Sequence, residues 1–378
     1  MVAPKPFPYP VFVTRPVIPP LDKYVERLRT IWERGWLTNH GDCERSLEEL
    51  LCAHLGAANL SVVANGTLAL MLACRALDLS GEVITTPFTF PATPHALLWA
   101  GLKPVFADID PDTFTIDPEC VDAAVTPLTS AILGVHVYGM PCDVVDLDEV
   151  SDRHGLRTLY DGAHAFGTTI EGRGIATFGD AVAFSFHATK LFHTAEGGAI
   201  AARDPATKAK INLLRNFGIR DQTTVLEPGI NAKLSELQAA LGILVLEEMD
   251  DEKKARAAVG TIYRQRLSGI AGIRCFTLPS TVGDSFQYFV IRVLAKECGI
   301  ERDQFVHRMQ AFNVVTRRYF FPLCSEYPHF RDLPSSRLEN LPVANRVTKE
   351  VVCLPYFGDL GTENAHRICD MIESVLCS

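Results

Sequence analysis

The sequence predicts an α/β protein with a largely parallel, buried sheet, followed by a smaller α+β domain. Three observations support this fold class. Short apolar runs alternate with stretches of helical periodicity. The 378 residues exceed what one hydrophobic core usually holds. The composition changes after residue 250, where a charged segment begins. Apolar residues make up 47% and charged residues 21%, a balance typical of globular proteins.

A helix and then a series of short strands are expected in order along the chain. Apolar residues recur at helical spacing between Leu21 and Trp32 and predict a helix that ends near Gly35. Residues 65–67 read as a turn and residues 68–77 as a helix. The apolar runs expected as strands are 61–64, 83–85, 104–108, 131–137, 158–160, 181–186 and 199–201. Strands separated by helices favour a parallel sheet that is buried on both faces.

The domain boundary is expected near residue 250. A long helical stretch over residues 234–249 is followed there by the charged segment 250–256. Beyond it, residues 287–294 predict a strand and residues 302–312 a helix. The expected organisation is an N-terminal arm and helix over 1–35, a large domain over 36–250 and a small C-terminal domain over 251–378.

The charge and the cysteine content of the chain limit the kinds of partner it can bind and the cell compartment in which it is expected. The formal net charge of −9 argues against nucleic acid as a partner, although local donors could still bind a phosphate-bearing small ligand. No apolar run reaches the roughly 18 residues that span a membrane, and residues 1–10 lack a secretory pattern. The 11 cysteines form no CxxC pair. We therefore expect reduced thiols, no metal site and a cytoplasmic location.

The most informative segment runs from Ser185 to Lys190 and is followed by Glu196-Gly197-Gly198. A lysine just past a buried strand has a lowered pKa, because burial disfavours its charged form, and its neutral amine can form a Schiff base. The alternative is an ordinary solvated lysine on a loop. The other motifs of the chain must decide between these readings.

Asp161 ends a predicted strand and opens the string Asp161-Gly162-Ala163-His164. A carboxylate at this place suits pyridoxal phosphate chemistry, which needs an acid group against the ring nitrogen to keep it protonated. The alternative is a helix cap or turn residue, a common role for aspartate.

Two further motifs fit the same cofactor. Gly66 and Thr67 lie where a strand turns into a helix, and helix N-termini favour phosphate. The Ser185 hydroxyl could bind the same phosphate. Phe90, in the string of residues 86–90, could stack on a pyridine ring. Each motif alone also fits an ordinary turn or a core aromatic, but their joint occurrence predicts a pyridoxal phosphate site.

Together these motifs resemble those of the sugar aminotransferases of the DegT/DnrJ/EryC1/StrS family, which have the aspartate-aminotransferase (type I) fold. The resemblance extends over nearly the whole chain. It is carried by residues 35–38, 65–67, 86–90, 161–164, 185–190, 229–234, 238–242 and 317–322. It implies the same large and small domains that the alternation of elements predicts.

The resemblance implies a role for each matching position. Lys190 would bind pyridoxal phosphate covalently, and Asp161 would pair with the pyridine nitrogen. The other cofactor contacts would be His164 near the phenolic oxygen, Phe90 over the ring, and Gly66, Thr67 and Ser185 at the phosphate. Asn231 or Lys233 would reach that phosphate from a second subunit, which implies a homodimer with shared active sites.

The string of residues 187–194 is similar to that of family members that make dTDP-4-amino-4,6-dideoxyglucose. The implied reaction moves an amino group from L-glutamate to a 4-keto-6-deoxy sugar nucleotide, dTDP-4-dehydro-6-deoxyglucose. Amination at carbon 3, or at carbon 4 of a UDP or GDP sugar, stays open because such members share the cofactor motifs. Arg317, Arg318 and Tyr319 are the candidate substrate contacts, since guanidinium groups match carboxylate and phosphate geometry. For the arginines, a structural salt bridge is the alternative.

Two positions depart from the family pattern. Gln287 stands where many members carry His, which bears on the sugar contact, and Lys233 stands where many carry Arg. Two other classes of protein share these motifs in part. A sugar dehydratase of this kind would carry His in place of Lys190. A non-catalytic sensor would carry an attached module, for which we expect no room in this length.

Overall fold

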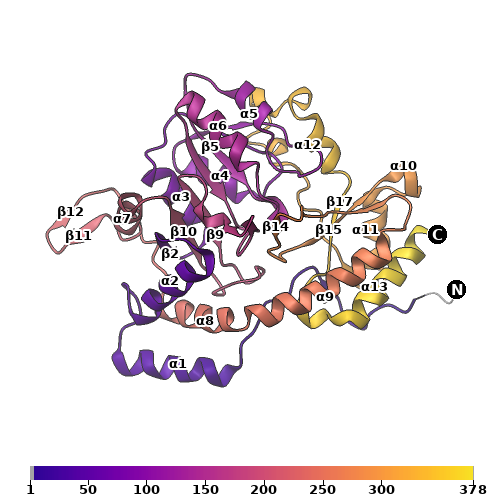
Figure 1. Cartoon of the computed structure of the whole chain (residues 1–378), viewed down its shortest axis with the longest axis horizontal. Helices are drawn as coiled ribbons and strands as arrows, with labels where there is room; N and C mark the ends of the chain where they lie inside the picture. The colour runs from indigo at the N-terminus through magenta and orange to yellow at the C-terminus, as the bar shows by residue number, and fades with distance from the viewer. Residues whose placement is uncertain (1–3, 378) are drawn as a thin grey trace.

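A seven-stranded sheet forms the centre of the first half of the molecule (Figure 1). The computed structural model describes residues 4–377. Residues 1–3 of the expected N-terminal arm and residue 378 of the expected C-terminal domain lie outside the described residues. The strands lie in the order β2 (Leu60–Val63), β10 (Gly198–Ala202), β9 (Ala181–Ser185), β6 (Arg157–Asp161), β5 (Thr129–Val135), β3 (Glu82–Thr85) and β4 (Lys103–Phe106). Strand β10 is antiparallel to both of its neighbours, and the other pairs are parallel. The predicted α/β class with a largely parallel sheet is confirmed.

Helices cover both faces of this sheet, because alternate side chains of each strand point to opposite sides. In β6, for example, Leu159 packs into one core cluster and Tyr160 into the other. One face carries α3 (Gly66–Ala76), α4 (Ala92–Trp99) and α7 (Pro205–Leu214). The other carries α2 (Asp42–Leu55), α5 (Pro118–Ala124), α6 (Val144–His154) and α8 (Glu236–Glu247).

Local capping explains where several elements begin and end. The Asn65 side chain accepts a hydrogen bond from the Leu68 N–H at 2.9 Å and starts α3. Gly35, at φ 66°, ends α1 (Leu21–Arg34) close to the predicted place. Ser235 and Gln238 form a capping box that starts α8 at residue 236, later than the predicted 234.

Most predicted elements differ from the observed ones by one or two residues at an end, and two of the differences have a clear local cause. The strand expected over 131–137 runs from residue 129 to 135, because Val137–Gly139 form a single 3-10 turn with Tyr138 at φ 56°. The helix expected over 234–249 ends at residue 247, and α9 (Met249–Leu267) begins directly after it. The charged segment 250–256 forms the first turns of α9.

The second half contains a three-stranded antiparallel sheet in the order β13 (Ile273–Cys275), β15 (Phe289–Val293) and β17 (Val351–Leu354). Helices α9, α11 (Arg302–Gln310) and α13 (Gly361–Leu376) pack against it around a separate apolar core. Helix α9 joins the two halves: Met249 belongs to the core of the first, whereas Val259 and Tyr263 belong to the core of the second.

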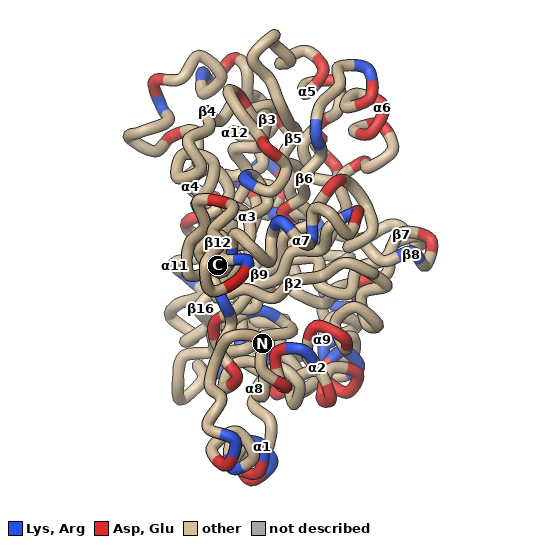
Figure 2. The backbone as a smooth tube through the Cα atoms, turned by 90° about the vertical axis from the view of Figure 1, so that its left-hand side faces the viewer, with Lys and Arg blue, Asp and Glu red and all other residues tan. Residues whose placement is uncertain are grey.

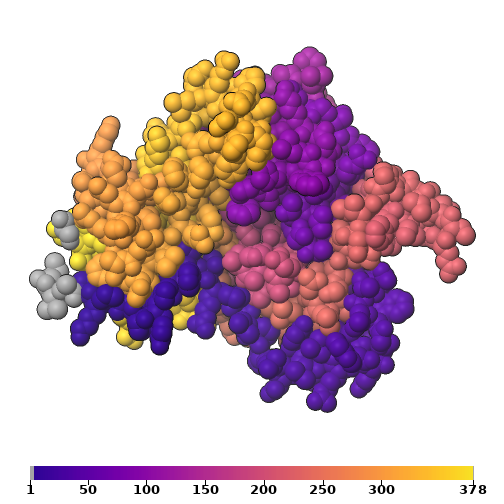
Figure 3. Space-filling model, turned by 180° about the vertical axis from the view of Figure 1, so that it is seen from behind, coloured from indigo at the N-terminus to yellow at the C-terminus, as the bar shows by residue number. Residues whose placement is uncertain are grey.

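The N-terminal segment belongs to the second half as well. Strand β1 (Val11–Phe12) pairs in parallel with β16 (Val314–Val315), and Phe7 enters the core under α13. Figure 3 shows this indigo segment lying against the orange C-terminal residues. Helix α1 then runs along α8, where the Tyr24 hydroxyl donates to the Leu237 carbonyl at 3.0 Å (Figure 1).

A hairpin of β11 (Ile219–Asp221) and β12 (Thr224–Val225) projects from the side of the first half (Figure 1). Its exposed apolar residues are Phe217, Ile219, Val225, Leu226 and Ile230.

A small sheet connects the two halves of the molecule and consists of β7 (Thr169–Ile170), β8 (Arg173–Gly174) and β14 (Val282–Gly283). The second half also contains the short helices α10 (Ala295–Cys298) and α12 (Pro342–Val347). Helix α1, seen nearly end-on in Figure 2, carries charged residues of both signs. Within residues 4–377, no helix has the length and apolar character that a membrane crossing requires.

Candidate active site

A cavity of about 390 Å³ opens at the carboxyl ends of the central strands. In sheets of this kind, ligands bind at that edge. Val135, Asp161 and Ser185, the last residues of β5, β6 and β9, lie along its floor. The N-terminus of α3 lines it from the first half of the molecule, and Tyr288, Arg317, Tyr319 and Phe320 line it from the second.

Lys190 lies in the cavity lining, on the loop that follows β9. Its backbone N–H donates to the His187 carbonyl at 2.8 Å, and its Nζ lies 5.9 Å from the centroid of the Tyr288 ring. Burial lowers the pKa of the amine to about 8, although the nearby Asp161 charge acts in the opposite direction. A substantial fraction of the amine is therefore uncharged near neutral pH, as a nucleophile requires.

Asp161 is buried at the end of β6 and faces the same cavity. Its Oδ1 accepts from the Ala163 N–H at 3.0 Å and its Oδ2 from the Thr93 hydroxyl at 2.8 Å. Burial raises the pKa of the carboxyl, while these two donors and the Lys190 charge lower it. The Ala163 contact is the turn bond that the alternative reading expected, and it coexists with a place in the cavity. A buried carboxylate of this kind is stabilised by a cation.

Gly66, Thr67 and Ser185 meet at one end of the cavity. A Cβ added at Gly66 would lie 2.7 Å from the Ser185 Cβ, so only glycine allows the first turn of α3 to approach β9 so closely. The first N–H groups of a helix have no partner within it, and the first two residues of α3, Gly66 and Thr67, line the cavity. This end can therefore bind an anion.

His164 and Phe90 also line the cavity. The His164 ring is buried and stacks on Phe320, with ring centroids 5.7 Å apart. Its Nδ1 accepts from the Tyr138 N–H at 3.3 Å, which leaves Nε2 to carry the proton. Burial, and to a smaller extent the Lys190 charge, hold the pKa of His164 well below its ordinary value. Phe90 is 55% exposed and presents a free aromatic face.

The three candidate substrate contacts separate into two groups. Arg317 and Tyr319 line the cavity. Arg318 is not among the lining residues, and its Nη1 lies 3.1 Å from the Asp303 Oδ1 in an ion pair on the outside. Successive residues of an extended chain point to opposite sides. Arg318 therefore forms the structural salt bridge that was the alternative for both arginines, whereas Arg317 stays a candidate substrate contact.

Asn231 and Lys233 lie away from the cavity of their own chain, at the base of the β11–β12 hairpin. The Lys233 Nζ donates to the side-chain oxygens of Asn216 and Asn231, at 2.9 Å each. It also lies 5.0 Å from the centroid of the exposed Phe217 ring. Neither residue is among those that line the cavity.

His187, Glu196 and Thr93 are among the cavity or near-cavity residues that were not assigned roles from the sequence. His187 and Glu196 line the cavity, with His187 Nε2 3.6 Å from Glu196 Oε1. The His187 Nδ1 accepts from the Thr189 N–H at 3.3 Å, which directs its other nitrogen at the carboxylate. Thr93 binds Asp161 from α4. His187 and Glu196 belong to the same string as Lys190, and that position was their only signal in the sequence.

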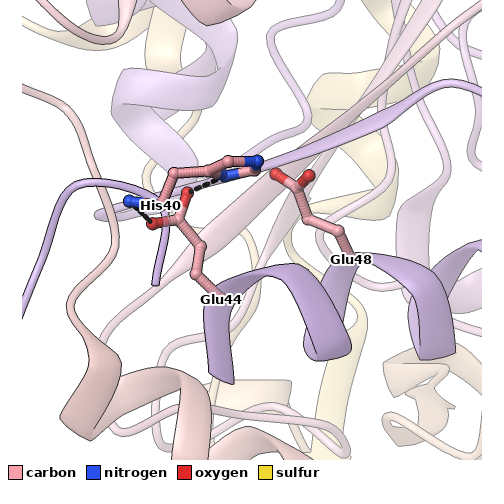
Figure 4. Close-up of side chains that lie close together, drawn as sticks. All are labelled: His40, Glu44 and Glu48. Carbon is pink, nitrogen blue, oxygen red and sulfur yellow. Dashed lines mark hydrogen bonds and ion pairs between the residues drawn. The ribbon is translucent and has the colours of Figure 1, made fainter. Parts of the chain in front are cut away.

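A second cluster of polar side chains lies at the start of α2 and in the segment before it, outside the cavity. His40, Glu44 and Glu48 bring three ligand-type atoms together (Figure 4). The buried Arg215 occupies this cluster: its Nη1 lies 3.2 Å from Glu44 Oε1 and 2.8 Å from Glu48 Oε1. The His40 Nδ1 lies 3.3 Å from Glu44. The guanidinium already compensates the two carboxylates, so the cluster is a structural ion pair network.

A mostly parallel sheet covered on both faces, with a partly buried lysine and a buried carboxylate beyond its strand ends, is the arrangement expected for the type I aminotransferase fold. The model of the DegT/DnrJ/EryC1/StrS aminotransferase family matches residues 22–373. The chain belongs to this family.

Individual relatives agree over almost the full length. The dTDP-4-amino-4,6-dideoxy-D-glucose transaminase of Escherichia coli is 40% identical over 363 residues, which are 95% of this chain and 97% of the relative. The enzyme of the same name from Shigella dysenteriae is 39% identical and covers 97% and 99%. Among solved structures, DesI, determined in the presence of its TDP-sugar product, has a TM-score of 0.94 at 38% identity, and the match covers 99% of this chain and 94% of DesI. DesV of S. venezuelae, in complex with a ketimine intermediate, has a TM-score of 0.86 at 28% identity, covering 94% and 95%.

Proposed function

We propose that this enzyme transfers the amino group of L-glutamate to carbon 4 of dTDP-4-dehydro-6-deoxyglucose, giving dTDP-4-amino-4,6-dideoxyglucose and 2-oxoglutarate. The observation that carries the proposal is the full-length similarity to two transaminases named for that product. The similarity to DesI, studied with a TDP-sugar product, supports the same class of substrate.

The cavity suits pyridoxal phosphate as the cofactor. It offers an amine with a lowered pKa at Lys190 and a buried carboxylate at Asp161. The end formed by Gly66, Thr67 and Ser185 suits a phosphate, because a Cβ at Gly66 would close the approach between α3 and β9. Lys190 would hold the cofactor covalently, and Asp161 would lie against its ring nitrogen.

When bound, pyridoxal phosphate supplies an electron-accepting ring that stabilises negative charge on the substrate carbon next to nitrogen. The Asp161 carboxylate would keep positive charge on the ring nitrogen, and Thr93 and Ala163 hold that carboxylate in place by hydrogen bonds. The Lys190 amine would carry a proton from the α-carbon of glutamate to the cofactor carbon that receives the amino group. Burial disfavours the charged form of His164, and its Nε2 would donate to the phenolic oxygen of the cofactor.

The remaining lining residues would contact the two substrates in turn. Arg317 suits the carboxylates of glutamate and the phosphates of the sugar nucleotide, because its guanidinium forms paired hydrogen bonds with such groups. The Glu196 carboxyl group lines the cavity and suits sugar hydroxyls as a hydrogen-bond acceptor. Tyr319 adds a hydroxyl group, and His187 adds a ring N–H group, to the lining of the same cavity.

The enzyme would act as a homodimer in which Asn231 and Lys233 complete the phosphate site of the neighbouring subunit. Two features support this arrangement. Both residues present polar groups outside their own cavity, and the hairpin beside them exposes several apolar side chains, which monomers usually bury. A two-fold axis would place each hairpin on the other subunit.

An assay with a panel of sugar nucleotides tests the activity. The purified protein is incubated with pyridoxal phosphate, L-glutamate and 4-keto or 3-keto sugars linked to dTDP, UDP or GDP, and the products are identified by mass spectrometry. We expect the 4-amino product from the dTDP-linked 4-keto sugar. Preferential amination of a 3-keto sugar, or of a UDP or GDP sugar, would contradict the proposed substrate.

Mixed dimers test the shared site. A Lys190→Ala chain is co-expressed with a chain that carries Asn231→Ala and Lys233→Ala, each with a different affinity tag. Neither homodimer should work well, whereas the purified mixed dimer should recover one active site. A monomer by sedimentation, or an inactive mixed dimer, would contradict the arrangement.

A further inference from the structure

Gln287 joins the second half of the molecule to the loop that carries Lys190. It is buried, 3% exposed, and lies just before β15. Its Oε1 accepts from the Leu191 N–H at 2.8 Å, and its Nε2 donates to the Thr189 carbonyl at 3.1 Å. One side chain thus binds the backbone immediately before and immediately after Lys190.

The pair of contacts requires an acceptor and a donor on one side chain. The Leu191 N–H needs the acceptor and the Thr189 carbonyl needs the donor, and the planar amide of Gln287 offers both on one carbon. Among other side chains, a neutral imidazole has the same pair of functions. A carboxylate could serve Leu191 alone, and an apolar side chain could serve neither. An unpaired backbone group in this buried place would be costly.

The segment that carries Gln287 is itself fixed at several points. The fully buried Arg256 donates from Nη1 to the Phe286 carbonyl at 3.0 Å, and its Nε lies 2.6 Å from the Glu252 carboxylate on the same helix. The Ser285 hydroxyl donates to the His164 carbonyl at 2.7 Å. Tyr288, the next residue, faces the Lys190 amine. The backbone on both sides of Gln287 is therefore held in place. As a result, the Gln287 side chain approaches the loop of Lys190 from one fixed direction.

We propose that Gln287 is a positioning residue, which clamps the backbone on both sides of Lys190 and so directs the amine into the cavity. The proposal rests on Lys190 being the cofactor lysine. Gln287 touches neither substrate nor cofactor in this role, because both polar ends of its side chain are engaged with the loop. The clamp also couples the position of the second half to the lysine, since any shift of β15 would pull on that loop.

The test compares Gln287→Met, Gln287→Glu and Tyr263→Phe with the wild type. Methionine keeps the length of glutamine but forms neither bond, and glutamate keeps the acceptor for Leu191. The control removes a comparable buried bond of the second half, from the Tyr263 hydroxyl to the Pro355 carbonyl. It keeps the ring that packs on Phe289 of β15 and removes no bond to the lysine loop. Three measurements are made: hydrogen exchange at the Leu191 amide, acylation of Lys190 against pH in cofactor-free protein, and kcat and KM for glutamate.

We expect Gln287→Met to speed exchange at Leu191 by about tenfold, which corresponds to the loss of one buried hydrogen bond. It should also lower kcat at nearly constant KM, and move the acylation midpoint of Lys190 upward as the loop admits water. In Gln287→Glu, exchange at Leu191 should stay close to that of the wild type, while kcat still falls. Tyr263→Phe should leave all three measurements unchanged.

Wild-type exchange and acylation in Gln287→Met, or equal changes in Tyr263→Phe, would overturn the proposal. If Gln287→Met does not fold, Gln287→Glu decides: a wild-type kcat there would overturn the clamp. A wild type that aminates no keto sugar would contradict the proposed function instead, and exchange and acylation would still decide the role of Gln287.

Discussion

Changing the pH of the cofactor-free protein should reveal the altered amine of Lys190. Burial lowers its pKa from 10.5 to about 8, so the neutral, reactive fraction should rise with pH and level off above about 8. At pH 7 roughly 10% of such an amine is neutral, against about 0.03% of an ordinary lysine, a difference of about 300-fold. Covalent capture of pyridoxal phosphate should be faster in proportion.

The rate of capture can be followed by the absorbance of the cofactor between pH 6.5 and 9.5. The range starts at 6.5 because a phosphate monoester itself titrates near pH 6. His164 should not contribute, since its pKa lies well below this window. Lys190→Ala provides the control for capture by other amines. A rate that keeps rising tenfold per pH unit up to pH 9.5 would show an ordinary lysine and refute the reasoning.

Three further predictions follow from the same geometry. Lys190→Ala should abolish turnover while the protein still binds the aminated form of the cofactor; product analysis and calorimetry check this, and near-normal transamination would contradict the mechanism. Asp161→Asn should leave the fold intact but slow the half-reaction with glutamate by about 100-fold or more, because the ring nitrogen loses its counter-charge; an unchanged rate by absorbance would return Asp161 to a turn residue. Arg215→Met should destabilise the protein by about 3–5 kcal/mol, because Glu44 and Glu48 stay buried without their cation; urea unfolding measures this, and adding Glu44→Gln and Glu48→Gln should recover most of the loss.

The placement of Gly66, Asp161 and Lys190 around one cavity was predictable because their signals in the sequence are local. Gly66, Asp161 and Lys190 each follow a strand that its apolar run identifies, and parallel strands bring their carboxyl ends to one edge. The positions of the predicted strands along the chain and their expected parallel direction were therefore enough to predict that these three residues lie close together. The antiparallel direction of β10 was not predicted, because an apolar run reads the same in both directions.

The second side of the cavity was not predictable in the same way. Gln287 contacts residues almost 100 positions earlier in the chain, and nothing in its own neighbourhood marks those partners. Arg317 and Arg318 are adjacent and chemically identical, and only the direction of the extended chain sends one to the cavity and the other to Asp303. Such contacts depend on how the two halves pack, which no local pattern contains.

The pairing of β1 with β16 has a consequence for how the protein is made. Val11 pairs with Val314, so about 300 residues must be synthesised after the first strand before its partner exists. At about 20 residues per second, the first strand waits at least about 15 seconds. The central sheet can assemble during that interval, whereas the second half cannot close its core until both ends of the chain have emerged. Translation speed over the last third of the message should therefore affect the yield of folded enzyme more than speed over the first third.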